Sequence, residues 1–151
     1  TIAKGLGGGI PVGALVTFGP EVSGLLQPGM HGSTFGGNPL ASAAGLAVLS
    51  TIERDGLLRH TSEVGDGFAA AVLALGHPQI REVRGRGLLR GIALSSPIAP
   101  AVMGIARADG FIVNAVAPDA IRIAPPLIIT AEQLASFTAA LPGILDRAVN
   151  S

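Results

Sequence analysis

The chain has 151 residues, is 48% hydrophobic and 13% charged, and its ten basic and ten acidic residues give a formal net charge of zero. This length allows one ordinary domain or two small ones, and so much apolar side chain with so little charge favours a deeply buried piece of a larger protein. The chain lacks Tyr and Trp, so it is not expected to bind nucleic acid. Without Cys or clustered histidines, it is not expected to hold a metal, and without a long unbroken apolar run, it is not expected to span a membrane.

The N-terminal part of the chain, residues 1–37, is rich in glycine and short of helical periodicity. Lys4 stands directly before the glycine-rich run 5–9. Residues 13–18 are mostly apolar and end at a Gly-Pro pair, which predicts a strand. A short helical turn is expected at 21–26, and the Gln-Pro-Gly sequence that follows would end it.

Two helices are predicted in the middle of the chain. Asn38 is a good N-cap and Pro39 suits the first helical position, so a helix is expected to begin there and to run through 40–52. This helix is apolar nearly all round, which predicts burial on most sides. After a possible break near Asp55, a second helix is expected at 57–75, before the stop signal of Gly and Pro that follows it.

After Gly76 the pattern changes to strand, strand, helix, strand, strand, helix, the order of a small α+β unit. The expected elements are strands at 80–84 and 88–94, a helix at 100–109, strands at 111–116 and 120–124, and a helix from Thr130 to about Val149. Thr130 and Gln133 have capping-box spacing at the start of the last helix. These changes predict two domains, 1–76 and 77–151.

Three arginines of the first predicted hairpin, Arg84, Arg86 and Arg90, alternate along the strands. They are interpreted as solvated or interdomain contacts rather than as a phosphate-binding cluster.

Lys4 is the only lysine among the ten basic residues. Arginine cannot replace lysine as a nucleophilic amine, because its guanidinium stays protonated. The glycines after Lys4 would let the backbone approach a bulky ligand closely. The same features also fit a flexible loop with an exposed lysine left by chance, and the residues alone leave both interpretations open.

A second cluster, residues 31–39, places Ser33 and Thr34 in a glycine-rich loop just before the helix at Asn38. Hydroxyls and free backbone N–H groups near a helix N-terminus suit an anion such as phosphate. A turn and N-cap with nothing bound is the alternative.

Four segments together resemble the class III aminotransferases, which depend on pyridoxal phosphate. Residues 1–13 resemble the Schiff-base lysine segment of that family, and 31–40, HGSTFGGNPL, resemble the second signature of its acetylornithine and ornithine branch. The stretches 84–92 and 121–127 resemble two further family segments in the expected order, so the resemblance covers nearly the whole chain.

The resemblance implies roles for four residues. Lys4 would bind pyridoxal 5'-phosphate covalently and then move a proton between substrate and cofactor. Thr34 would bind the cofactor phosphate from the neighbouring subunit, and Ser33 would contact the substrate, which together imply a homodimer with a shared site. Arg122 would receive a substrate carboxylate; a structural ion pair is the alternative for this arginine.

The implied fold class is α/β: the C-terminal part of a fold type I aminotransferase, with the end of the large cofactor-binding domain (1–76) and a small α+β domain (77–151). The implied reaction is transfer of the δ-amino group of N-acetylornithine to 2-oxoglutarate, in cytoplasmic arginine biosynthesis. Ornithine, succinyl-diaminopimelate and 4-aminobutyrate are alternative amino donors. Because the chain starts at the lysine segment, it is expected to lack much of the active site. The alternative function for the chain by itself is that of a non-catalytic, self-associating module.

Overall fold

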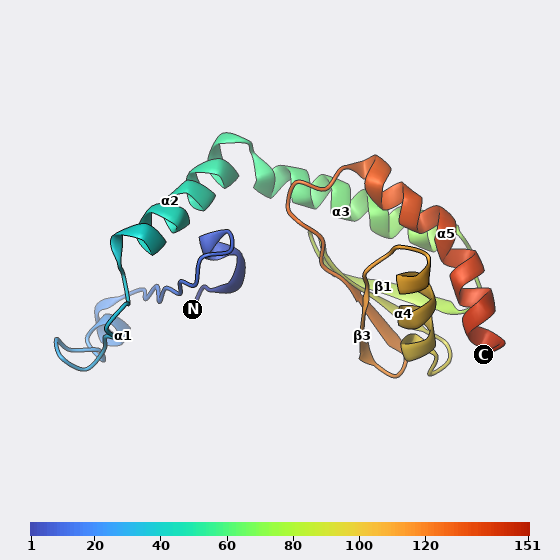
Figure 1. Cartoon of the computed structure of the whole chain (residues 1–151), viewed down its shortest axis with the longest axis horizontal. Helices are drawn as coiled ribbons and strands as arrows, with labels where there is room; N and C mark the ends of the chain where they lie inside the picture. The colour runs from blue at the N-terminus through green and yellow to red at the C-terminus, as the bar shows by residue number, and fades with distance from the viewer. The chain divides into compact units, whose positions relative to one another are not determined.

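The computed structural model describes all 151 residues and divides them into two compact units, 1–56 and 57–151. Each unit has its own elements, which Figure 1 traces from blue to red. The first unit contains the 3-10 helix η1 (Lys4–Gly7), α1 (Pro20–Ser23) and α2 (Pro39–Arg54). The second contains α3 (Leu57–Ala74), β1 (Ile80–Arg86), β2 (Leu89–Leu94), α4 (Ala99–Ala108), β3 (Asn114–Ala117), β4 (Ala120–Ile123) and α5 (Ala131–Val149).

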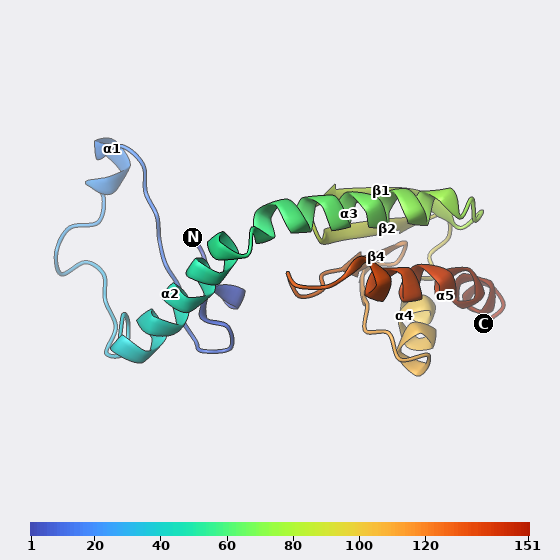
Figure 2. The same ribbon diagram turned by 90° about the horizontal axis from the view of Figure 1, so that it is seen from above.

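The second unit is a four-stranded antiparallel sheet covered on one face by its three helices. The strand order is β1-β2-β4-β3, and every neighbouring pair is antiparallel. Helix α3 runs along β1 and β2, and α5 contacts both α3 and α4 (Figure 2). Fully buried side chains from the sheet and the helices meet in this layer, including Val72, Ile92, Val102, Ile121 and Leu141. Because side chains alternate across a strand, the neighbours of these sheet residues point to the opposite face.

Local signals in the sequence set the ends of the helices in this unit. Thr130 accepts a hydrogen bond from the backbone N–H of Gln133, whose side chain accepts one from the Thr130 N–H, so the predicted capping box is confirmed. Helix α5 continues through Pro142. At the end of α4, Asp109 pairs with Arg147 of α5. The hydrogen bond from Arg147 holds the pKa of the Asp109 carboxyl below its usual value.

The first unit has little regular structure besides α2. Asn38 caps this helix as predicted, because its side-chain oxygen accepts a hydrogen bond from the Ala41 N–H at 3.0 Å. The predicted strand at 13–18 is wrong for this chain: only Ala14 forms a bridge, to Ile2. A strand needs a partner along its length, and no other segment of the chain pairs with residues 15–18.

Helix α2 is far more exposed in this chain than its apolar sequence predicts. Only Ala41 and Gly45 are buried along it, whereas Leu40 and Leu46 are 69% and 67% exposed. An apolar helix is buried only where another surface covers it, and within the first unit η1 is the element that packs on α2.

The boundary between the compact units differs from the predicted one. The sequence predicts α3 in one domain with α2, before a boundary at Gly76, whereas the two compact units are divided between Gly56 and Leu57. Helix α3 belongs to the second unit because it packs against β1, β2 and α5. The assignment of 1–76 and 77–151 to a large and a small aminotransferase domain remains a prediction.

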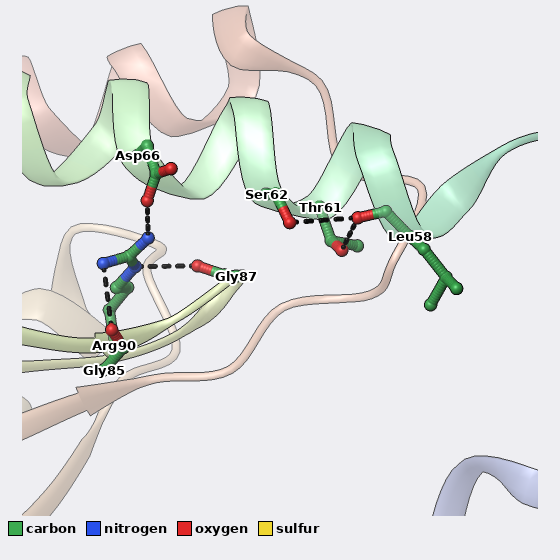
Figure 3. A network of polar contacts seen from close by, with 7 residues as sticks. All are labelled: Leu58, Thr61, Ser62, Asp66, Gly85, Gly87 and Arg90. Carbon is green, nitrogen blue, oxygen red and sulfur yellow. Dashed lines mark hydrogen bonds and ion pairs between the residues drawn. The ribbon is translucent and has the colours of Figure 1, made fainter.

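The turn between β1 and β2 is fastened to α3 by Arg90, which is only 7% exposed. Its Nε donates to the Gly87 carbonyl at 2.7 Å, its Nη1 donates to the Gly85 carbonyl at 3.2 Å, and its Nη2 pairs with Asp66 (Figure 3). The interpretation of Arg90 as a solvated residue was therefore wrong. Its pairing with Asp66 agrees with the alternative of an interdomain contact when the predicted boundary at Gly76 is used. One buried guanidinium donates to the carbonyl of Gly87 in the turn and to that of Gly85 in β1, and its pair with Asp66 connects the hairpin to α3.

We expect Arg90→Ala to destabilise the second unit by about 2–3 kcal/mol, because two carbonyls lose a charged donor. Asp66 keeps access to water, since its side chain is 75% exposed, which limits the loss. Hydrogen exchange of the β1 and β2 amides would measure the change. Arg86→Ala is the matched control in the same hairpin, because Arg86 is exposed and makes no ion pair. Equal protection in the two variants would contradict this role for Arg90.

Candidate active site

Lys4 lies on a short loop that is closed by the chain itself. Ile2 and Ala14 exchange two backbone hydrogen bonds, each of 2.8 Å, which join the two ends of the loop. Inside the loop, Lys4 begins η1 with φ 58°, and it is the only non-glycine residue of the chain with positive φ. A lysine pays an energetic cost for this backbone conformation, which indicates that the surrounding loop imposes it.

The glycines after Lys4 serve packing as well as turning. Gly7 is buried, and a Cβ atom on it would lie 2.8 Å from Val12 Cγ1. A Cβ atom on Gly8 would lie 3.2 Å from Val48 Cγ2 of α2. The loop therefore packs closely on α2.

The Lys4 side chain is exposed and takes part in none of the ion pairs of the chain. Its amine is therefore free to react with a ligand, while its backbone is held by the closed loop.

The second motif forms a tight turn that leads into α2. The Gly36 N–H donates to the Ser33 carbonyl at 3.2 Å, and both the backbone and side-chain N–H groups of Asn38 donate to Phe35. A Cβ atom on Gly36 would lie 2.7 Å from Ser33 Oγ, so a side chain at this position would require the Ser33 hydroxyl to turn away. Thr34, between them, is exposed.

The two motifs meet in one groove of about 380 Å³ within the first unit. Its walls come from the end of the lysine loop and from the turn before α2. They are formed by Pro11, Val12, Gly13, Ser33, Phe35, Gly36, Gly37 and Ala41. Ser33 thus lines the groove, whereas Lys4 and Thr34 are not among its lining residues.

Arg122 lies in the second unit, on β4, and is exposed. Its Nη2 donates to Asn114 Oδ1 of β3 at 2.7 Å, and it forms no ion pair with any carboxylate. The alternative of a structural ion pair therefore has no support within the chain. Asn114 was not identified from the sequence.

The chain has neither a cluster of metal-ligating side chains nor a helix suited to a membrane. No group of three or more His, Cys, Asp or Glu side chains is arranged to hold a metal ion. None of the helices combines the length and the apolar character that crossing a membrane requires.

The family model described as Aminotransferase class-III matches residues 1–145. The chain belongs to the class-III aminotransferase family. Two curated relatives are named acetylornithine aminotransferase. The one from Mycobacterium tuberculosis is 57% identical over 151 residues, and the one from Streptomyces coelicolor is 52% identical over 151 residues. The match covers all of this chain in both cases, but only 38% and 37% of the relatives, so the chain spans well under half of their length.

Solved structures of aminotransferases share its fold. Plasmodium falciparum ornithine delta-aminotransferase aligns with a TM-score of 0.82 and 28% identity, covering 99% of this chain and 39% of that one. Acetylornithine aminotransferase from Elizabethkingia anophelis aligns with a TM-score of 0.74 and 32% identity, covering 83% of this chain and 33% of that one. The predicted mixed helix-and-sheet fold of this family is confirmed.

Proposed function

We propose that this chain carries the cofactor lysine of an acetylornithine aminotransferase. That enzyme is about as long as the relatives and is called the whole protein below. The whole protein transfers the δ-amino group of N-acetylornithine to 2-oxoglutarate, giving glutamate, in cytoplasmic arginine biosynthesis. The observation that carries the proposal is Lys4: it is the chain's only lysine, and its exposed amine lies on a loop closed by the Ile2–Ala14 bridge. The chain that holds Lys4 is 57% identical to a relative named acetylornithine aminotransferase.

The groups available in the first unit fit pyridoxal 5'-phosphate. Attaching its aldehyde requires an uncommitted primary amine, which Lys4 supplies. Holding its phosphate requires hydrogen-bond donors, and the exposed Thr34 hydroxyl is one. Lys4 would hold the cofactor of its own subunit, and Thr34 would hold that of the neighbouring subunit.

The cofactor, when bound, supplies a pyridine ring that acts as an electron sink. The chain supplies the proton transfer. With the cofactor bound, the Lys4 amine would act as general base toward the substrate carbon that bears the reacting nitrogen. It would then act as general acid toward the C4′ carbon.

Ser33 and Thr34 are proposed to complete a site that two subunits share. Ser33 contacts the substrate, and Thr34 binds the phosphate of the neighbouring subunit's cofactor, so the protein works as a homodimer. Thr34 is exposed and does not line the groove that Ser33 lines. Its hydroxyl is therefore available to a neighbouring subunit, which supports the proposed role.

Arg122 is proposed to bind the carboxylate of the substrate. An arginine offers two parallel N–H donors to a carboxylate, and Arg122 has no carboxylate partner in the chain that would occupy them.

The function is tested by turnover of the whole protein with four amino donors. We expect N-acetylornithine, with 2-oxoglutarate as acceptor, to give the highest kcat/KM. Ornithine, succinyl-diaminopimelate and 4-aminobutyrate are the competitors, and a clear preference for 4-aminobutyrate would overturn the proposed substrate.

A second function, as a non-catalytic self-associating module, is proposed for the 151-residue chain by itself. Large apolar side chains of its first unit are exposed, among them Phe18 at 85% and Phe35 at 80%. Such surface favours association. The same turnover assay separates the two functions, because the chain alone is expected to be inactive where the whole protein turns over.

A further inference from the structure

Four residues form one row across the exposed face of the sheet. Strand register pairs Arg84 with Gly91, Gly91 with Arg122, and Arg122 with Asn114. Paired residues point to the same face, and the flanking Ile92 and Ile121 point into the core, so this row lies on the face that the helices leave open.

Within this row, Arg122 is held by a neutral acceptor. Its Nη2 donates to Asn114 Oδ1 at 2.7 Å. Six other arginines of the chain are paired with carboxylates: Arg54, Arg59, Arg81, Arg84, Arg90 and Arg147. An amide oxygen orients a guanidinium and leaves its positive charge in place. A carboxylate would orient the guanidinium and also neutralise its charge.

Gly91, the neighbour of Arg122 on the other side, has no side chain of its own. Beyond Gly91, the Arg84 side chain leans over the same row, because a Cβ atom on Gly91 would lie 3.6 Å from Arg84 Cγ. The charge of Arg84 is offset by Glu82, at 3.4 Å. Arg122 therefore differs from Arg84: a neighbouring side chain holds its guanidinium in place, but no carboxylate neutralises its charge.

We propose that Asn114 is a positioning residue for Arg122. It fixes the guanidinium through one N–H and leaves the remaining donors and the full positive charge for a substrate carboxylate. The inference rests on the proposed role of Arg122 in carboxylate binding. Its consequence is that residue 114 must be a neutral acceptor, since a carboxylate there would compete with the substrate for the same arginine.

The test compares Asn114→Asp, Asn114→Ala and Asn114→Gln in the whole protein, with steady-state rates against 2-oxoglutarate concentration. We expect Asn114→Asp to raise KM for 2-oxoglutarate about tenfold or more, with kcat changed by less than about threefold. Asn114→Ala should raise KM by about threefold, because the guanidinium keeps its charge but loses its orientation. Asn114→Gln retains a neutral acceptor and should restore much of the affinity.

Gln133→Glu is the matched control. It makes the same change of amide to carboxylate in the same unit, and a glutamate at this capping-box position can still accept the Thr130 N–H. It should leave the KM for 2-oxoglutarate unchanged, which separates a local effect at Arg122 from added negative charge.

Arg122→Lys separates failure of this inference from failure of the proposed carboxylate site. If Arg122→Lys raises KM and Asn114→Asp does not, the positioning role of Asn114 is overturned and the site stands. If neither raises KM, the proposed role of Arg122 fails as well. A fall in kcat with unchanged KM in both Asn114→Asp and Asn114→Ala would also overturn the inference, because it would indicate general damage to the sheet.

Discussion

Replacing Lys4 by alanine in the whole protein is expected to lower kcat by on the order of 10³-fold or more, because one amine both attaches the cofactor and transfers the proton. Lys4→Arg should be equally inactive, since a guanidinium keeps the charge but is not a useful nucleophile. Turnover of N-acetylornithine and the visible absorbance of lysine-bound pyridoxal phosphate should both disappear in the two variants.

Addition of a small primary amine provides the control for folding. Methylamine is expected to restore part of the turnover of Lys4→Ala, where the side chain is missing, and little of that of Lys4→Arg, where a side chain fills the space. Wild-type kcat in Lys4→Arg would contradict the assignment, because that variant keeps the positive charge and lacks only the amine.

Gly65→Ala should destabilise the second unit by about 3 kcal/mol, the upper part of the range for overpacking. Gly65 is buried on α3, and a Cβ atom there would overlap the carbonyl group of Gly87 in the turn between β1 and β2. The neighbour is backbone, and Arg90 also binds this carbonyl, so it cannot move away without breaking a second contact. Urea unfolding of the chain, followed by circular dichroism, would measure the loss.

Gly67→Ala is the matched control, two positions further along the same helix. A Cβ atom on Gly67 would meet nothing within 4 Å. We therefore expect a gain of about 0.5–1 kcal/mol, the usual advantage of alanine over glycine inside a helix. Equal stabilities of the two variants would show that α3 does not rest on the Gly87 turn.

Local signals in the sequence predicted most elements of the fold. Asn38 with Pro39, and Thr130 with Gln133, marked the starts of two helices, because capping depends on residues only a few positions apart. The order of strand, strand, helix, strand, strand and helix after Gly76 predicted a small α+β unit. Each of these signals is complete within one element or one hairpin.

Features that depend on distant surfaces were not predicted. Residues 15–18 are apolar but have no pairing partner in this chain, and Leu40 and Leu46 of α2 have no surface to cover them. Helix α3 could not be assigned to its unit, because its length and apolar content do not say which element it will meet. These outcomes depend on tertiary contacts rather than on local preference.

The candidate site was predicted only in part, for a similar reason. Lys4 stood out by composition and by its glycine-rich setting. Asn114 did not, because a register shift between Ala115 and Ala117 in β3 decides which residue faces Arg122. Arg90 resembled its exposed neighbours in sequence, and only the packing of α3 on the hairpin buries it.

The claim that Lys4 is the cofactor lysine is tested most directly by locating the covalent bond. The whole protein would be incubated with pyridoxal 5'-phosphate, reduced with borohydride and digested, and its peptides analysed by mass spectrometry. The account predicts the pyridoxyl-phosphate mass on the peptide that contains Lys4 and on no other lysine in stoichiometric amount. Stoichiometric labelling of a different lysine, with the Lys4 peptide unmodified, would contradict it.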